Sequence, residues 1–127
     1  MADFIITIRP EPDASRDVGW LKRYQVPALA LPVMQAKQQP FNLPDAALFQ
    51  AIIFTSRHAV AAFADLSKHV SLRSLPVYAV GRSTALAARQ AGFDQVTTGR
   101  GNGEGLLTLI KADLQQDAGK ILWPRAT

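Results

Sequence analysis

The chain has 127 residues, of which 48% are hydrophobic and 19% charged, with a formal net charge of +4 and no cysteine. This composition is that of a folded globular protein, and it excludes disulfides, thiolate catalysis and zinc sites built on cysteine. The charge excess favours an anionic ligand only weakly. No apolar run approaches the roughly 20 residues of a membrane span, and the first residues lack the basic start of a signal peptide, so we expect a cytoplasmic protein.

The first part of the chain predicts a strand, a helix and a second strand. Residues 4–8 form a short β-rich run, and a helix is expected to begin near Pro12 and Asp13. Residues 28–34 are apolar but contain Pro32, which favours an edge or crossover strand. The polar segment AKQQPFNLPDA then carries two prolines and is typical of a linker. We therefore divide the chain into residues 1–35 and residues 36–127.

The second part alternates strands with helices. We expect strands over 51–54, 76–80, 95–98 and 120–123, and helices over 57–66, 83–91 and 106–114, with Gly92 just past the end of the second helix. Parallel strands need a crossover helix, and short apolar runs without polar alternation favour strands buried on both faces. The prediction is an α/β protein: an open doubly wound parallel sheet lobe with flanking helices, plus an N-terminal β-α piece of a second, incomplete lobe.

Two features indicate a chain cut from something longer. The first unit is too small to complete a sheet of its own, and no helix follows the last predicted strand. We therefore expect that the two lobes are completed by further chain, and that the 127-residue chain is inactive alone.

The ends of the predicted strands share one chemical character. In an open parallel sheet, ligands bind beyond the carboxyl ends of the strands. Those positions hold hydroxyls, glycines and arginines, and no carboxylate precedes Glu104: Arg9; Thr55, Ser56 and Arg57; Gly81, Arg82, Ser83 and Thr84; Thr98 to Gly103; Pro124, Arg125 and Thr127.

Such an edge is suited to anions. Helix amino ends offer free N–H groups and partial positive charge, and arginine binds carboxylate or phosphate in a bidentate manner. Helix capping is an equally good explanation for Ser56 and Ser83 taken singly.

Other kinds of site find less support. The loop GRGNGEG lacks the spacing of a dinucleotide fingerprint and the Gly-Lys-Ser/Thr of a phosphate-binding loop, so a simple strand-to-helix turn is favoured. His58 and His69 are the only histidines, which argues against a metal site; His58 is expected early in a helix, where it could donate a hydrogen bond at the cleft. Trp20 and Trp123 are interpreted as packing residues. Scattered basic residues argue against nucleic-acid binding.

Five segments in order resemble the uroporphyrinogen-III synthase family: ITIRPEPDA, IIFTSRHAVAAF, LPVYAVGRSTALAARQAGF, TTGRGNGEGLLTLI and GKILWPRAT. The family more often has asparagine where this chain has His58.

The resemblance implies two α/β lobes joined by crossing strands, with the active site in the cleft between them, and one lobe built from both ends of the chain. It implies a hydro-lyase that dehydrates and cyclises hydroxymethylbilane to uroporphyrinogen III, with no cofactor, no metal and no membrane, and a monomer at full length. Carried over by position, Thr84 is the catalytic candidate. The substrate-binding candidates are Arg9, Thr55, Ser56, Arg57, Gly81, Ser83 and Thr84. The family's proposed catalytic tyrosine lies in a C-terminal half that this chain does not contain.

Two alternatives stay open. One is a non-catalytic α/β module that binds a tetrapyrrole or another anionic small ligand. The other, ranked lower, is a phosphate-receiver domain of similar architecture, which would require acidic residues at the strand ends.

Overall fold

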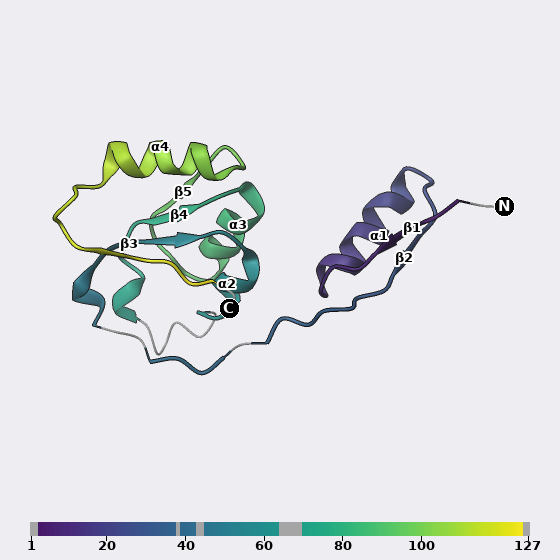
Figure 1. Cartoon of the computed structure of the whole chain (residues 1–127), viewed down its shortest axis with the longest axis horizontal. Coiled ribbons are helices and arrows are strands. Elements are labelled where there is room, and N and C mark those ends of the chain that lie inside the picture. Colours follow the sequence, from purple (N-terminus) through teal and green to yellow (C-terminus); the bar gives the residue numbers. More distant parts are fainter. Residues whose placement is uncertain (1–2, 38, 43–44, 64–69, 126–127) are drawn as a thin grey trace. The chain divides into compact units, whose positions relative to one another are not determined.

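The computed structural model describes residues 3–37, 39–42, 45–63 and 70–125, and its backbone contacts divide the chain into two compact units (Figure 1). Unit 1 is Met1–Gln39 and unit 2 is Pro40–Thr127. Each unit is described by itself below.

Unit 1 is a β-α-β element. Strand β1 (Ile5–Thr7) leads to helix α1 (Asp13–Arg23) and then to β2 (Ala28–Ala30), which pairs with β1 in parallel. The helix begins directly after Pro12, as expected. Strand β2 ends two residues before Pro32, in agreement with the exclusion of proline from paired strand interiors.

Unit 2 contains the α/β lobe. Its elements in chain order are the 3-10 turn η1 (Ala46–Leu48), β3 (Phe49–Phe54), α2 (Arg57–Ala61), the 3-10 turn η3 (Val70–Leu72), β4 (Val77–Ala79), α3 (Arg82–Gln90), β5 (Val96–Thr98), α4 (Gly103–Asp113) and β6 (Lys120–Leu122). The strand order is β5-β4-β3-β6, and all neighbours are parallel. This confirms the predicted α/β fold with a parallel sheet and flanking helices.

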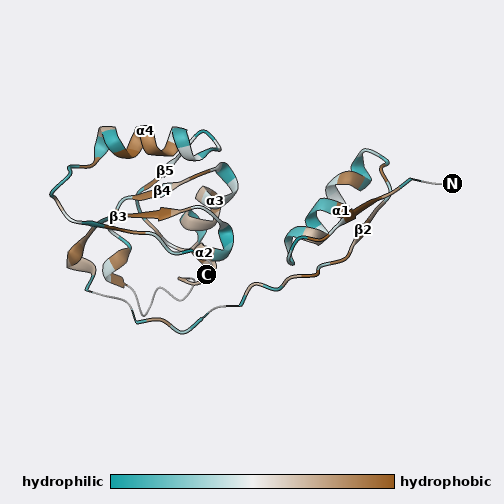
Figure 2. Cartoon of the chain, viewed as in Figure 1, coloured by the Kyte–Doolittle hydropathy of each residue, from teal (hydrophilic) through white to brown (hydrophobic). Residues whose placement is uncertain are grey.

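Most of strand β3 is apolar, as its colour in Figure 2 shows, and its side chains enter core clusters on both faces of the sheet. Ile52 and Phe54 belong to one core cluster, whereas Ala51 and Ile53 belong to the other. Side chains alternate along a strand, so a strand covered on both sides must be apolar at every position. The run AIIF meets this requirement.

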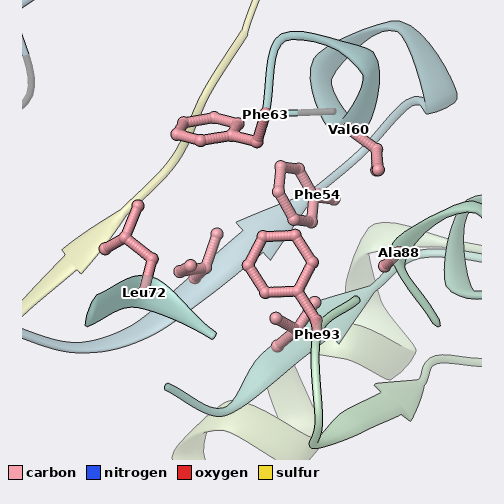
Figure 3. Close-up of a cluster of buried hydrophobic side chains, with 8 residues drawn as sticks. Phe54, Val60, Phe63, Leu72, Ala88 and Phe93 are labelled. Carbon is pink, nitrogen blue, oxygen red and sulfur yellow. The ribbon is translucent and has the colours of Figure 1, made fainter. Parts of the chain in front are cut away.

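The first core cluster lies under α2 and α3 and is built around aromatic rings (Figure 3). The Phe54 ring lies 5.9 Å from that of Phe63 and 5.5 Å from that of Phe93, both in edge-on geometry. Val77 and Ala88 are fully buried beside them. Such contacts add about 0.5–1.5 kcal/mol per pair beyond burial, so this face supplies much of the stability of unit 2.

The opposite face of the sheet is covered by α4 (Figure 1). Leu106 and Tyr78 are each 4% exposed there. The Tyr78 hydroxyl donates a hydrogen bond of 3.1 Å to Asp113 Oδ2, which ties the last turn of α4 to strand β4. Burial, followed by the hydrogen bond and charge of Asp113, raises the pKa of Tyr78 above its usual value.

Several element boundaries differ from the predictions: β2 ends at Ala30 instead of residue 34, β3 begins at Phe49 instead of residue 51, and two helices begin earlier than expected. Helix α4 begins at Gly103 instead of residue 106, because the Asn102 side chain accepts a hydrogen bond from Gly105 N–H and so caps the helix earlier. Helix α3 begins at Arg82 instead of Ser83. The helix predicted over 57–66 ends as α2 at Ala61, and Ala62 and Phe63 form a turn; residues 64–66 and His69 lie outside the described residues. None of the helices in the described ranges has the length and apolar content that a membrane crossing requires.

Candidate functional site

Parallel pairing in unit 2 brings several predicted site residues to one edge of the sheet. Phe54 at the end of β3 pairs with Ala79 at the end of β4, and Ala79 pairs with Thr98 at the end of β5. The segments that follow these strands, beginning with Thr55 and Gly81, therefore leave the sheet side by side. We call this region the strand-end edge.

Thr55 is exposed directly after β3, and its side chain has a partner that the sequence did not predict. Its Oγ1 accepts a hydrogen bond of 3.4 Å from Trp123 Nε1, which follows β6. The Trp123 side chain is 51% exposed, and the Arg125 guanidinium lies 5.2 Å from its ring centroid. Trp123, which was interpreted as a packing residue, is half exposed at the strand-end edge and contacts Thr55 and Arg125 there.

Ser56 is the N-cap of α2. Its Oγ accepts a hydrogen bond of 3.2 Å from Ala59 N–H, so the capping explanation is confirmed for this residue. Arg57 and His58 are the first two residues of α2 and are half-buried, and both have interaction partners within the protein.

The capping explanation is wrong for Ser83, because the N-cap of α3 is Gly81. Ser83 is instead an exposed residue of the first turn, and Thr84 follows with only 8% of its surface exposed. The Thr84 side chain is therefore almost entirely buried in the first turn of α3. Its catalytic assignment stays a prediction.

The amino ends of α2, α3 and α4 all lie at the strand-end edge, but they are capped differently. Ser56 caps α2 and Asn102 caps α4 with side-chain oxygens. Helix α3 has no side-chain cap, because Gly81 carries no side chain. The first N–H groups of a helix lack partners inside it, so the amino end of α3 offers donors to a ligand that the other two helices have satisfied in part.

Arg9 belongs to unit 1, and carboxylates of its own unit surround it. Its Nη1 donates to both carboxylate oxygens of Asp17 at 2.9 and 3.1 Å, and its Nη2 lies 3.1 Å from Asp13 Oδ2. Asp17 also accepts a hydrogen bond of 3.0 Å from Thr7 Oγ1. These contacts join the end of β1 to α1, and they offset the positive charge that an anionic ligand would require.

Sequence reasoning left Arg89 out of the site, yet it lines a hollow at the strand-end edge together with Arg82 and Arg100. The sequence could have predicted this, because residues 82, 86 and 89 have the i, i+4, i+7 spacing of one helix face. The GRGNGEG loop proves to be a strand-to-helix turn that ends in the Asn102 cap, as favoured. Within the described ranges, no three histidine, aspartate or glutamate side chains gather in a way that could hold a metal ion.

Comparison with known proteins identifies the family. A family model described as uroporphyrinogen-III synthase HemD matches residues 16–127. The match includes all of unit 2 and begins within α1, after the segment ITIRPEPDA. A search of curated proteins found no match. Because the matched range covers most of the chain, this protein belongs to the uroporphyrinogen-III synthase family.

Proposed function

We propose that this protein catalyses the uroporphyrinogen-III synthase reaction. The substrate, hydroxymethylbilane, is a linear tetrapyrrole with acetate and propionate side chains. The C–O bond of its hydroxymethyl group breaks and the oxygen leaves as water. The carbon left behind forms a C–C bond to the substituted carbon of the last pyrrole, and the bond from that carbon to its existing methylene bridge breaks. The freed methylene then bonds to the unsubstituted carbon of the same pyrrole, which loses one proton, so the ring closes with the last pyrrole inverted. No oxidant or reductant is required, so the enzyme is a lyase without a cofactor.

The observation that supports this proposal best is the uncapped amino end of α3 at Gly81, beside the exposed hydroxyl of Thr55. A flexible polyanion must be held in one conformation for the correct carbon to react. Fixed N–H groups, hydroxyls and arginines can do this by positioning and electrostatic preorganisation, without a strong nucleophile.

The residues take the following proposed roles. Thr55, Ser56, Gly81 and Ser83 present hydroxyls or backbone N–H groups to substrate carboxylates, and Arg57 adds a positive charge. Thr84 contributes a hydrogen bond near the reacting end. Arg9 is proposed to bind a carboxylate through those guanidinium N–H groups that Asp13 and Asp17 do not hold.

Isomer analysis tests the proposal. The protein, expressed from its complete coding sequence, is incubated with enzymatically made hydroxymethylbilane, and the oxidised products are separated by isomer. We expect uroporphyrinogen III in excess over the spontaneous, uninverted isomer. Thr84→Val should lower that excess about tenfold or more, whereas Thr84→Ser should keep most of it because the hydroxyl remains. Uninverted product alone from the unmodified protein would refute the function.

A second candidate is a tetrapyrrole-binding protein without catalysis. The burial of Thr84, which is 8% exposed, favours it, because the same edge could bind a polyanion without assisting water loss. Calorimetry with the stable octacarboxylate uroporphyrin I separates the two. Binding without any production of the inverted isomer would support the carrier.

The proposal also includes a cytoplasmic location and a monomeric state at full length. A family enzyme acting on a small molecule needs neither a partner chain nor a membrane for the chemistry described. Analytical ultracentrifugation of the protein expressed from its complete coding sequence would show the monomer mass.

A further inference from the structure

A half-open hollow of about 870 Å³ lies between α3 and the loop from β5 to α4, beside the strand-end edge. Three arginines and three glycines account for most of its lining: Arg82, Arg89, Arg100, Gly81, Gly99 and Gly101. We call it the basic hollow. It is adjacent to the candidate site, since Gly81 belongs to both. Arg82 and Arg100 were expected at the strand ends, but none of the three arginines was among the substrate-binding candidates.

The fold brings the three arginines together from two segments. Arg82 and Arg89 lie seven residues apart in α3, which is about two helical turns on one face. Arg100 is held in place by its neighbours: Gly99 N–H bonds to Ala79 O at 2.7 Å, and Gly101 N–H bonds to Val80 O at 2.9 Å. The loop is thereby fixed against the end of β4.

These same hydrogen bonds occupy two backbone donors of the loop. With Gly99 N–H and Gly101 N–H already bonded, the donors of the hollow include the arginine side chains, the Thr98 hydroxyl and the first turn of α3. The glycines contribute space: Gly101 has a φ of +86°, which a side chain rarely adopts, and a Cβ on Gly99 would lie 3.2 Å from Val80 O.

The positive charges in the hollow are not balanced within the described part of unit 2. Arg89 Nη2 donates to Val96 O at 3.2 Å, which is a neutral acceptor. Neither Arg82 nor Arg100 forms an ion pair with a carboxylate of a described residue. Like charges in one hollow repel each other, and an anion that entered would relieve this repulsion and accept bidentate hydrogen bonds.

We infer that the basic hollow binds one carboxylate-bearing side arm of the tetrapyrrole, held by Arg82 and Arg100, while the rest of the substrate lies along the strand-end edge. This inference rests on the proposed function for the identity of the ligand. Arg89, whose Nη2 donates a hydrogen bond to Val96 O, adds a third positive charge to the hollow. The hollow would act as an anchor that sets which arm of the polyanion lies next to Gly81.

The test is a binding titration of the whole chain with uroporphyrin I, followed by calorimetry and by ¹⁵N signals of the arginine side chains. We expect the Arg82 and Arg100 signals to shift. Arg82→Gln and Arg100→Gln should each raise the dissociation constant about tenfold, because a charge-assisted hydrogen bond is lost. Arg82→Lys should lose less, since it keeps the charge. Arg73→Gln is the matched control: an exposed arginine of unit 2, before β4, that should change binding less than twofold.

Each outcome decides the inference. Loss of affinity in both Gln variants but not in Arg73→Gln supports it. Equal affinity in all variants overturns it while leaving the proposed function intact, because isomer analysis measures that separately. Absence of any uroporphyrin binding by the unmodified chain also overturns it. If inorganic phosphate shifts the two arginine signals and uroporphyrin I does not, the hollow is a phosphate site and the inference is wrong.

Discussion

Unit 1 and unit 2 each place arginine beyond the carboxyl end of a strand, but they surround it differently. In unit 1, Asp13 and Asp17 hold the Arg9 guanidinium within 3.1 Å. In unit 2, Arg82 and Arg100 line a hollow without a carboxylate partner among the described residues. The same residue type at the same kind of position thus joins two elements in one unit and has no carboxylate partner among the described residues in the other.

The difference shows that an arginine after a strand is not by itself an anion site. For Arg9 and Arg82 the difference lies in the adjacent helix. Helix α1 carries carboxylates four and eight residues after Arg9, whereas α3 carries Leu86 and Gln90 at those spacings from Arg82.

A substitution in the core of unit 2 should destabilise that unit strongly and leave unit 1 unchanged. Phe54→Ala removes a fully buried ring from unit 2 and should lower its free energy of unfolding by about 3–5 kcal/mol. Urea unfolding followed by Trp123 fluorescence in a Trp20→Phe background measures this. The Trp20 signal of unit 1, in a Trp123→Phe background, should keep its midpoint. Equal shifts of both signals would contradict two separate units, and Leu86→Ala, at an exposed position, is the control.

Removing the ion pair between Asp17 and Arg9 tests this comparison directly. Asp17→Ala deletes the bidentate contact to Arg9 and the hydrogen bond from Thr7. Because the pair is partly exposed, we expect a loss of only about 1 kcal/mol in unit 1, measured by urea unfolding with Trp20 fluorescence. Asp3→Ala removes an exposed carboxylate from the same unit and should have little effect. An equal loss of stability in both variants would show that the contact between Asp17 and Arg9 contributes no more than an exposed carboxylate does.

An alkaline titration tests the contact between α4 and the sheet. The pKa of Tyr78 is raised by burial and by Asp113, so the unfolded chain releases the tyrosine proton first, near pH 10.0. The stability that this group contributes is present below that pH and is lost as the pH rises toward the higher folded pKa. Tyr78→Phe should remove this alkaline loss and cost about 1 kcal/mol at neutral pH. Tyr24→Phe, in unit 1, should leave the pH profile of unit 2 unchanged.

The smallest effect concerns the uncapped helix. Gly81 has an extended backbone, and a Cβ there would approach nothing closer than Gly101 Cα at 4.0 Å. Gly81→Ser should therefore fit, cap α3 and raise the stability of unit 2 by a few tenths of a kcal/mol. It should also weaken uroporphyrin binding, since the new hydroxyl occupies an N–H donor. Gly81→Ala lacks the cap and should lower stability, and an increase with alanine would contradict the capping argument.

Local patterns in the sequence determined much of the architecture. Short apolar runs, a proline before α1 and glycine after α3 were sufficient to predict the strands, the helices and the parallel sheet, because burial and backbone geometry act over a few residues. Thr55 and Gly81 could also be predicted to lie close together. Parallel topology places the carboxyl ends of neighbouring strands at one edge of the sheet.

Tertiary packing determines which polar groups already have a partner within the protein. Hydrogen bonds and ion pairs between segments far apart in the chain, such as Trp123 to Thr55 across 68 residues, cannot be read from local periodicity. Local periodicity also does not predict that the N-cap position of α3 is Gly81 and not Ser83. Nor does it predict that Arg82, Arg89 and Arg100 line one hollow. Composition supplies the charges, but packing determines which of them already have a partner.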